Sequence, residues 1–110
     1  MIQQGHIISV PFPYSNFKGL KIRPALIVSN ANVNNSSDVI AVQISKKPDP
    51  FGPGIALDVQ DFSEGNLREK SSIYPHRIHL IEKSTIIGII GKVKPHILKE
   101  ALEKIQEFLS

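Results

Sequence analysis

The sequence contains no cysteine and no tryptophan, and only 6% of its 110 residues are aromatic. Without cysteine the chain can form no disulfide, use no catalytic thiol and hold no cysteine-ligated zinc. A membrane-spanning helix needs about 20 consecutive apolar residues, whereas the longest apolar run, Ile86 to Ile90, is broken by Gly88. The first residues lack the basic segment and apolar stretch of a secretory signal. We therefore expect a cytoplasmic protein that does not associate with membranes.

Length and charge set broad limits on the kind of protein. A chain of 110 residues fits a single domain with one modest core. Its formal net charge of +3 and its pI near 9.3 favour an anionic partner. The lysines and arginines are scattered rather than gathered in a dense stripe, so a mildly basic solvated surface explains the charge equally well.

Most of the chain shows the pattern of short β-strands separated by turns. Pro11 and Pro13 flank Phe12, and we expect the first strand to leave the sheet there because proline donates no ladder hydrogen bond. Polar or charged stretches at 30–37 and 61–70 predict turns, and the Pro- and Gly-rich stretch 46–54 predicts a loop. The predicted strands are 6–12, 23–29, 38–45, 55–59, 72–80 and 86–93.

The C-terminal segment is predicted to be a helix that begins at Pro95, where the missing N–H of proline is tolerated. Apolar residues recur there at steps of three and four, which places them on one stripe. That stripe most simply packs on the sheet. Strands followed by one helix indicate a small barrel or sandwich, because a parallel α/β sheet needs a helix after most strands.

Several segments resemble a known family when they are taken in order. They are Gly-His-Ile-Ile-Ser-Val-Pro-Phe-Pro-Tyr-Ser at 5–15, Arg-Pro-Ala-Leu-Ile-Val-Ser at 23–29, Asp-Val-Ile-Ala-Val-Gln-Ile-Ser at 38–45, the stretch 71–81, and Gly-Lys-Val at 91–93 before the closing helix. Together they resemble the PemK-type toxins of the MazF/PemK family. The resemblance implies a mainly β fold with a C-terminal helix, an SH3-like small barrel of the MazF/PemK/CcdB type.

The same resemblance implies what such a protein does. It implies a metal-independent, sequence-specific endoribonuclease toxin that needs no cofactor, cleaves single-stranded RNA, forms a homodimer and is neutralised by a cognate antitoxin. RNA can be cleaved without a metal when its own 2′-hydroxyl attacks the neighbouring phosphate. The enzyme then supplies a base, an acid and stabilisation of the developing charge.

Two residues are candidates for contact with that phosphate. The guanidinium of Arg23 stays charged and can donate two parallel hydrogen bonds to phosphate oxygens. Ser45 stands where the family places a catalytic threonine or serine, and its hydroxyl could orient the phosphate. Alternatively, Arg23 is a solvated residue at a strand edge and Ser45 an ordinary residue at a strand end.

Proton transfer and further phosphate contacts are assigned from the remaining polar residues. His76 is the first candidate for proton transfer and His6 the second, since histidine titrates near pH 6.5. Both histidines replace acids that related sequences carry, so they could also mark lost catalysis or be structural. Lys46, Lys47 and Arg77 could contact phosphates.

Single-stranded RNA also needs flat side chains on which its bases can stack. Tyr14 and Phe17, with Lys18 beside them, form one candidate RNA-binding loop. Phe51 and Tyr74 are further stacking candidates, whereas Phe12, Phe62 and Phe108 are expected in the core. No metal site is predicted.

Two other functions stay open at this point. A relative that has lost catalysis would bind RNA or an antitoxin-like peptide only, and its RNA affinity would be sensitive to salt. A protein-targeting toxin of the same fold, one that poisons a topoisomerase, would need neither Arg23 nor Ser45.

Overall fold

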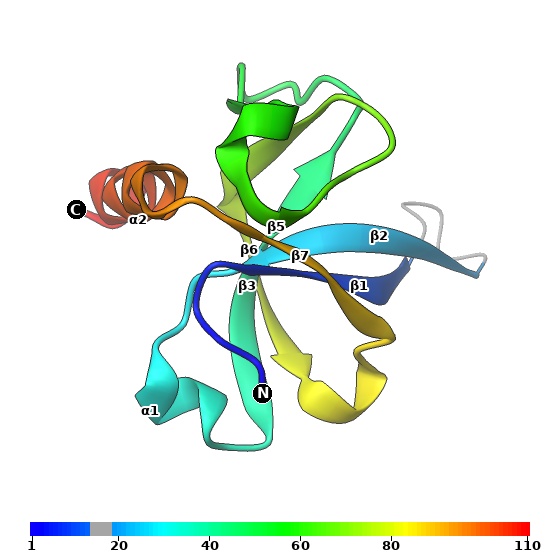
Figure 1. Ribbon diagram of the computed structural model, residues 1–110. Coiled ribbons are helices and arrows are strands. Elements are labelled where there is room, and N and C mark those ends of the chain that lie inside the picture. The colour runs from blue at the N-terminus through cyan, green and yellow to red at the C-terminus, as the bar shows by residue number, and fades with distance from the viewer. Residues whose placement is uncertain (14–18) are drawn as a thin grey trace.

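The computed structural model describes residues 1–13 and 19–110. Within these residues one curled antiparallel sheet has the strand order β4-β6-β3-β2-β1-β7-β5. The strands are β1 (His6–Pro13), β2 (Leu20–Ile27), β3 (Asp38–Ser45), β4 (Ile55–Leu57), β5 (Phe62–Gly65), β6 (Ser71–Glu82) and β7 (Gly88–Val93). Figure 1 shows the sheet curling between the C-terminal helix α2 (Pro95–Leu109) and the projecting β1–β2 hairpin. The predicted mainly β fold with a C-terminal helix is confirmed.

Apolar residues form a separate cluster on each face of the sheet, and β3 contributes to both. Val42 and Ile44 belong to the cluster beneath α2, which buries Ile97 and Ala101 of the helix. Val39 and Ala41 belong to the cluster on the opposite face. This alternation is the one that the sequence predicts, and it follows from the two-residue period of a strand.

The prediction that the chain leaves the sheet at the two prolines is wrong. Strand β1 continues through Pro11 to Pro13 and pairs with β2 as far as Leu20. Its pairing with β7 ends earlier, at Ser9. Beyond Ser9 no described strand pairs with this side of β1, so no backbone N–H has to be donated to it and prolines are tolerated.

Two predicted turn regions contain regular structure. The stretch 30–37 holds a short helix, α1 (Ala31–Asn34), capped by the Asn30 side chain, which accepts a hydrogen bond from the N–H of Asn32 at 3.0 Å. The stretch 61–70 holds β5, which begins at buried Phe62 opposite Val93. Two short 3-10 turns, η1 (Val59–Asp61) and η2 (Lys83–Thr85), complete the described elements.

Strand β6 has an irregularity halfway along its pairing with β3. Tyr74 pairs with Gln43, but the next residue of β3 in the ladder, Val42, pairs with Ile78. The segment 75–77, which contains His76 and Arg77, therefore has no partner opposite it on β3. An insertion of this kind bends a strand and redirects its side chains.

Candidate nucleic-acid interface

The pairing of β2 with β3 ends at Ala25 and Gln43, and the two strands separate beyond that pair. Arg23 lies two residues beyond Ala25 on β2, and Ser45 lies two residues beyond Gln43 on β3, so both lie past the same end of the ladder. Because side chains alternate, Arg23 lies on the face of Ala25 and Ser45 on the face of Gln43. The end of the ladder thus brings the guanidinium and the hydroxyl that the sequence singles out to the same place.

Arg23, Ser45 and Lys47 line two adjoining clefts, of about 230 Å³ and 170 Å³. We name the larger the basic cleft; it is lined by Lys21, Ile22, Arg23, Pro24, Ile44, Ser45, Lys46, Lys47, Leu67, Arg68, Glu69 and Ser71. We name the smaller the polar cleft; it is lined by Arg23, Gln43, Ser45, Lys47, Pro48, Asp49, Tyr74 and Arg77. The floor of the basic cleft is partly apolar, whereas the polar cleft has polar or charged walls on several sides.

Positive charge is concentrated around the two clefts. Their linings include six basic side chains, Lys21, Arg23, Lys46, Lys47, Arg68 and Arg77. The two acidic residues in the linings are already paired, Glu69 with Lys46 at 3.0 Å and Asp49 with Arg77. Arg23, and after it Lys47, lowers the pKa of the Lys21 ammonium by repulsion. A bound anion would relieve this repulsion, so the site is suited to a phosphate.

Ser45 has a local hydrogen bond that fixes the start of the next loop. Its Oγ accepts a hydrogen bond from the backbone N–H of Lys47 at 3.2 Å. Among the described residues no partner accepts the hydroxyl hydrogen, so the hydroxyl can donate to a ligand in the clefts. Nearby, the phenol of Tyr74 donates to the Lys47 carbonyl at 3.0 Å. Tyr74 is buried, so the prediction that it offers a stacking surface is wrong.

The remaining wall of the polar cleft comes from the β3–β4 loop and from the irregular segment of β6. Asp49 accepts hydrogen bonds from Phe51 N–H, at 2.8 Å, and from Arg77 Nε, and it lies 3.2 Å from His76 Nε2. The hydrogen bond from Phe51, and after it the Arg77 guanidinium, lowers the pKa of the Asp49 carboxyl. Asp49 is therefore a carboxylate at neutral pH.

His76 is close to the clefts but is not part of their linings. Its ring packs on Phe51, with centroids 4.5 Å apart, and lies 6.3 Å from the Phe108 ring. Phe108 is 38% exposed, so its predicted place in the core is wrong, whereas Phe12 and Phe62 are buried as predicted. Phe51 is largely exposed and stays a stacking candidate.

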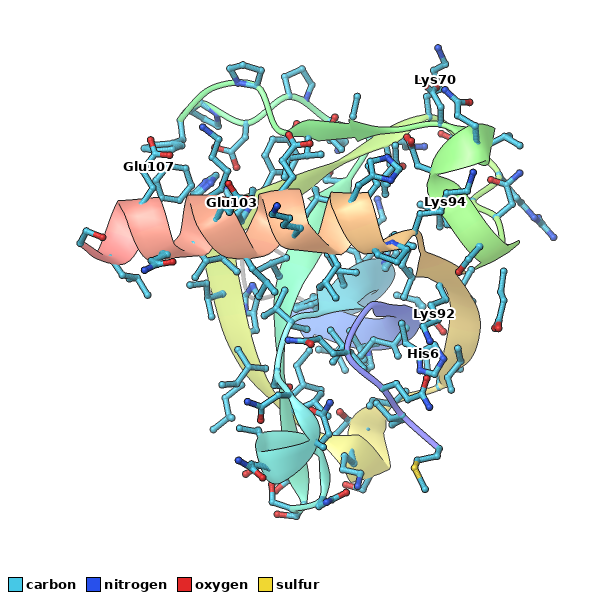
Figure 2. The ribbon with its side chains drawn as sticks, turned by 60° about the vertical axis from the view of Figure 1, so that its left-hand side comes forward. His6, Lys70, Lys92, Lys94, Glu103 and Glu107 are labelled. Carbon is cyan, nitrogen blue, oxygen red and sulfur yellow. The ribbon has the colours of Figure 1, made fainter. Side chains whose placement is uncertain are left out.

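The structure separates His6 from the other predicted site residues. His6 begins β1 and pairs with Lys92 of β7, and Figure 2 shows the two side by side. Burial, and after it Lys92, lowers the pKa of His6, whose Nδ1 accepts a hydrogen bond from the N–H of Gln3 at 2.8 Å. His6 lines neither cleft. The predicted RNA-binding residues Tyr14, Phe17 and Lys18 lie outside the described residues.

Sequence reasoning missed several residues that line the clefts, chiefly Lys21, Gln43, Asp49 and Arg68. Gln43 carried a usable signal, because it is a polar residue in an otherwise apolar central strand. Asp49 and Arg68 carried none, since they lie in loops that only the folded chain brings to this place.

Two absences complete the description of the site. Among residues 1–13 and 19–110, no group of three or more potential metal ligands gathers at one place. In the same residues, no helix combines the length and the apolar character that crossing a membrane requires.

These features define a class, a small mainly β protein whose curled sheet carries a cationic cleft at the point where two strands separate. The family model of the PemK-like, MazF-like toxins of type II toxin–antitoxin systems matches residues 3–109, so the chain belongs to that family.

Solved structures show the same fold. The MazE–MazF complex (Form-III) from Deinococcus radiodurans matches with a TM-score of 0.77 at 17% identity, over 98% of this chain and 95% of that one. A mycobacterial endoribonuclease in complex with its cognate antitoxin matches with a TM-score of 0.67 at 18% identity, over 97% and 96%. The comparison with curated proteins gives no match.

Proposed function

We propose that this protein is a sequence-specific endoribonuclease toxin that cleaves single-stranded RNA. One observation carries the proposal: Arg23 and Ser45 line the same two clefts, in surroundings rich in positive charge. Family membership supports it, as do the endoribonuclease and MazE–MazF structures that share the fold.

In the proposed reaction the RNA supplies the nucleophile, so no metal or cofactor is needed. The 2′-hydroxyl attacks the adjacent phosphorus, the 5′-oxygen of the next nucleotide leaves, and a 2′,3′-cyclic phosphate remains. Arg23 stabilises the negative charge that develops on the non-bridging oxygens, and Ser45 orients them by hydrogen bonding. Removing a preorganised donor of this kind costs about 100- to 1,000-fold in rate.

For proton transfer we propose His76. Its Nε2 lies 3.2 Å from Asp49, which lines the polar cleft. The Asp49 side chain therefore separates the imidazole from the proposed phosphate position. A water molecule beside the ring, or the ribose itself, would have to bridge that gap. His6 lies four residues along β1 from Val10, the partner of Arg23, and lines neither cleft, so we propose no catalytic role for it.

We further propose the partners that the family resemblance implies. They are single-stranded RNA, a cognate antitoxin and a second copy of the chain. The basic residues of the two clefts suit an acidic antitoxin segment as well as they suit a phosphate backbone. The proposal places the protein in the cytoplasm, where the RNA is.

The test is incubation of the purified protein with a long single-stranded RNA in buffer containing EDTA. Discrete fragments that end in 2′,3′-cyclic phosphate are expected. Arg23→Ala should slow their formation about 100- to 1,000-fold, and a substrate with 2′-deoxyribose at the cleaved position should stay intact. Lys99→Ala, which removes one exposed charge on α2, is the matched control. Intact RNA at a large excess of enzyme would show that the protein is not a nuclease.

If the RNA is not cut, a binding measurement distinguishes the alternatives. RNA affinity that falls steeply with salt, without cleavage, would assign the protein to the binding class. Growth arrest on expression in cells whose RNA is unchanged would point to a protein target.

A further inference from the structure

Asp49 occupies an unusual position for a carboxylate. Its side chain is only 5% exposed, although it lies in the loop between β3 and β4. Burial of a charge is costly unless hydrogen bonds and opposite charges compensate it. Here the Phe51 N–H and His76 Nε2 both approach Oδ1, while Arg77 Nε donates to Oδ2. All three contacts converge on one carboxylate at the wall of the polar cleft.

The contacts of Asp49 fix the direction of the Arg77 side chain, which strand pairing leaves unfixed. Residues 75–77 have no partner on β3, so no ladder fixes the direction in which Arg77 projects. The Arg77 side chain is 44% exposed and lines the polar cleft with Arg23. With Nε held by Asp49, the two terminal nitrogens of Arg77 are left to donate to a ligand.

Aromatic rings pack against this cluster at His76. Phe51 covers His76, and Phe108 from the last turns of α2 meets Phe51 edge-on, with centroids 5.3 Å apart and planes at 89°. Geometry of this kind is favourable between aromatic rings. The two rings thus pack against His76, one of the three groups that contact Asp49.

We propose that Asp49 is a positioning residue: it directs the guanidinium of Arg77 toward the phosphate that Arg23 binds, so that two arginines hold one phosphate from two strands. Asp49 does not itself contact the substrate in this scheme. The inference rests on the proposed function, because it deepens the description of the same phosphate site.

The test is a double-mutant cycle of Asp49→Asn and Arg77→Ala, measured by RNA cleavage under saturating and limiting substrate. Asparagine keeps the shape and can still accept from Phe51, but it loses the charge that pairs with Arg77. Asp49→Asn is expected to lower kcat about tenfold or more with a smaller effect on KM. In the Arg77→Ala background it should have a much smaller further effect, because the guanidinium that Asp49 positions is gone and only the contact of Asp49 with His76 is still altered.

Two further variants separate positioning from simple loss of structure. Arg77→Lys lacks the Nε–H that donates to Asp49, so it should behave like Arg77→Ala and should reduce the effect of Asp49→Asn to the same small remainder. Asp58→Asn, which loses an exposed pairing with Lys70, is the matched control and should cleave normally. The proposal fails if the losses from Asp49→Asn and either Arg77 variant multiply, or if Asp49→Asn cleaves like the wild type.

The same double-mutant cycle can also be measured by RNA binding. The quantity is then the dissociation constant of each variant for a non-cleavable, 2′-deoxy-substituted RNA. If the wild type binds RNA but does not cut it, the proposed nuclease function fails. The coupling between residues 49 and 77 in the binding measurement then supports or overturns the positioning role separately.

Discussion

The imidazole of His79 stands edge-on to the ring of Phe12, with ring centroids 4.9 Å apart and planes at 61°. Burial, and after it the charge of Arg77, lowers the pKa of His79. His6 is also buried with a lowered pKa. In the unfolded chain both histidines titrate near pH 6.5. On acidification through that range the unfolded chain therefore binds protons at these two positions that the folded chain does not, and these two groups then lower the stability.

We expect the melting temperature to decrease as the pH is lowered from about 7.5 to about 5.5, across the reference histidine pKa. His79→Phe, which keeps the ring contact with Phe12 and removes the titrating group, should make the decrease smaller. Thermal melts at a series of pH values measure both effects. Asp49 affects stability in a separate, more acidic pH range, because a carboxyl group with a lowered pKa loses its stabilising charge only there. A melting temperature that is constant or rises on acidification would contradict the lowered pKa of these two histidines.

Replacement of Ser45 by alanine should slow cleavage with little change in stability. The hydroxyl is lost from both clefts, and the only described partner of its oxygen is the backbone N–H of Lys47. We expect kcat to fall about 10- to 100-fold, less than for a lost guanidinium. Ser45→Thr keeps the hydroxyl and should retain most of the activity. Ser84→Ala, on η2 and outside the linings of both clefts, controls for removal of a serine hydroxyl. An equal loss in all three variants would show that the hydroxyl of Ser45 has no special role.

Lys47 should contribute charge rather than catalysis. It lines both clefts, so Lys47→Ala should weaken the binding of single-stranded RNA and reduce the slope of log K against log salt by about 0.7. Lys99→Ala, on the exposed surface of α2, should leave the slope unchanged. Fluorescence anisotropy at four salt concentrations measures the slope. The same slope for wild type and Lys47→Ala would place the RNA elsewhere.

Gly54 is required because the β3–β4 loop passes close to β6. A Cβ at this position would meet the Ile73 carbonyl oxygen, and it would lie 2.9 Å from Tyr74 Cε1. Gly54→Ala should therefore displace the loop that carries Asp49, lower the melting temperature and reduce cleavage. At Gly88 an added Cβ meets nothing within 4 Å, so Gly88→Ala is the matched control and should cleave normally. Normal activity and stability of Gly54→Ala would show that the loop is free to shift.

Much of the sheet follows from periodicity within single segments. Alternation along 38–45 predicts the two faces of β3, because each side chain of a central strand meets one of two clusters. The apolar stripe after Pro95 similarly predicts α2. The extension of β1 through Pro13 could not be predicted in this way, because it depends on where β7 stops pairing. Strand β5 was missed because a single buried aromatic, Phe62, anchors it in a charged stretch.

The candidate site was predicted unevenly for a similar reason. Arg23 and Ser45 were identified by resemblance, and the separation of β2 from β3 explains why they line the same clefts. The partners of Asp49 could not be identified, since Arg77 is 28 residues away in the sequence and meets it only across the irregular part of β6. A role that arises from a loop folding onto a distant segment leaves no local pattern in the sequence.

The place of the twelve-residue strand β6 in the sequence determines when the clefts can form during synthesis. It pairs with β3 and β4 and also carries Arg77, yet it is synthesised after both of those strands. Until it leaves the ribosome, one edge of β3 has no neighbour and Asp49 has no guanidinium to bind. Nascent chains that stop before residue 71 thus lack residues that line both clefts, and the clefts are complete only late in synthesis.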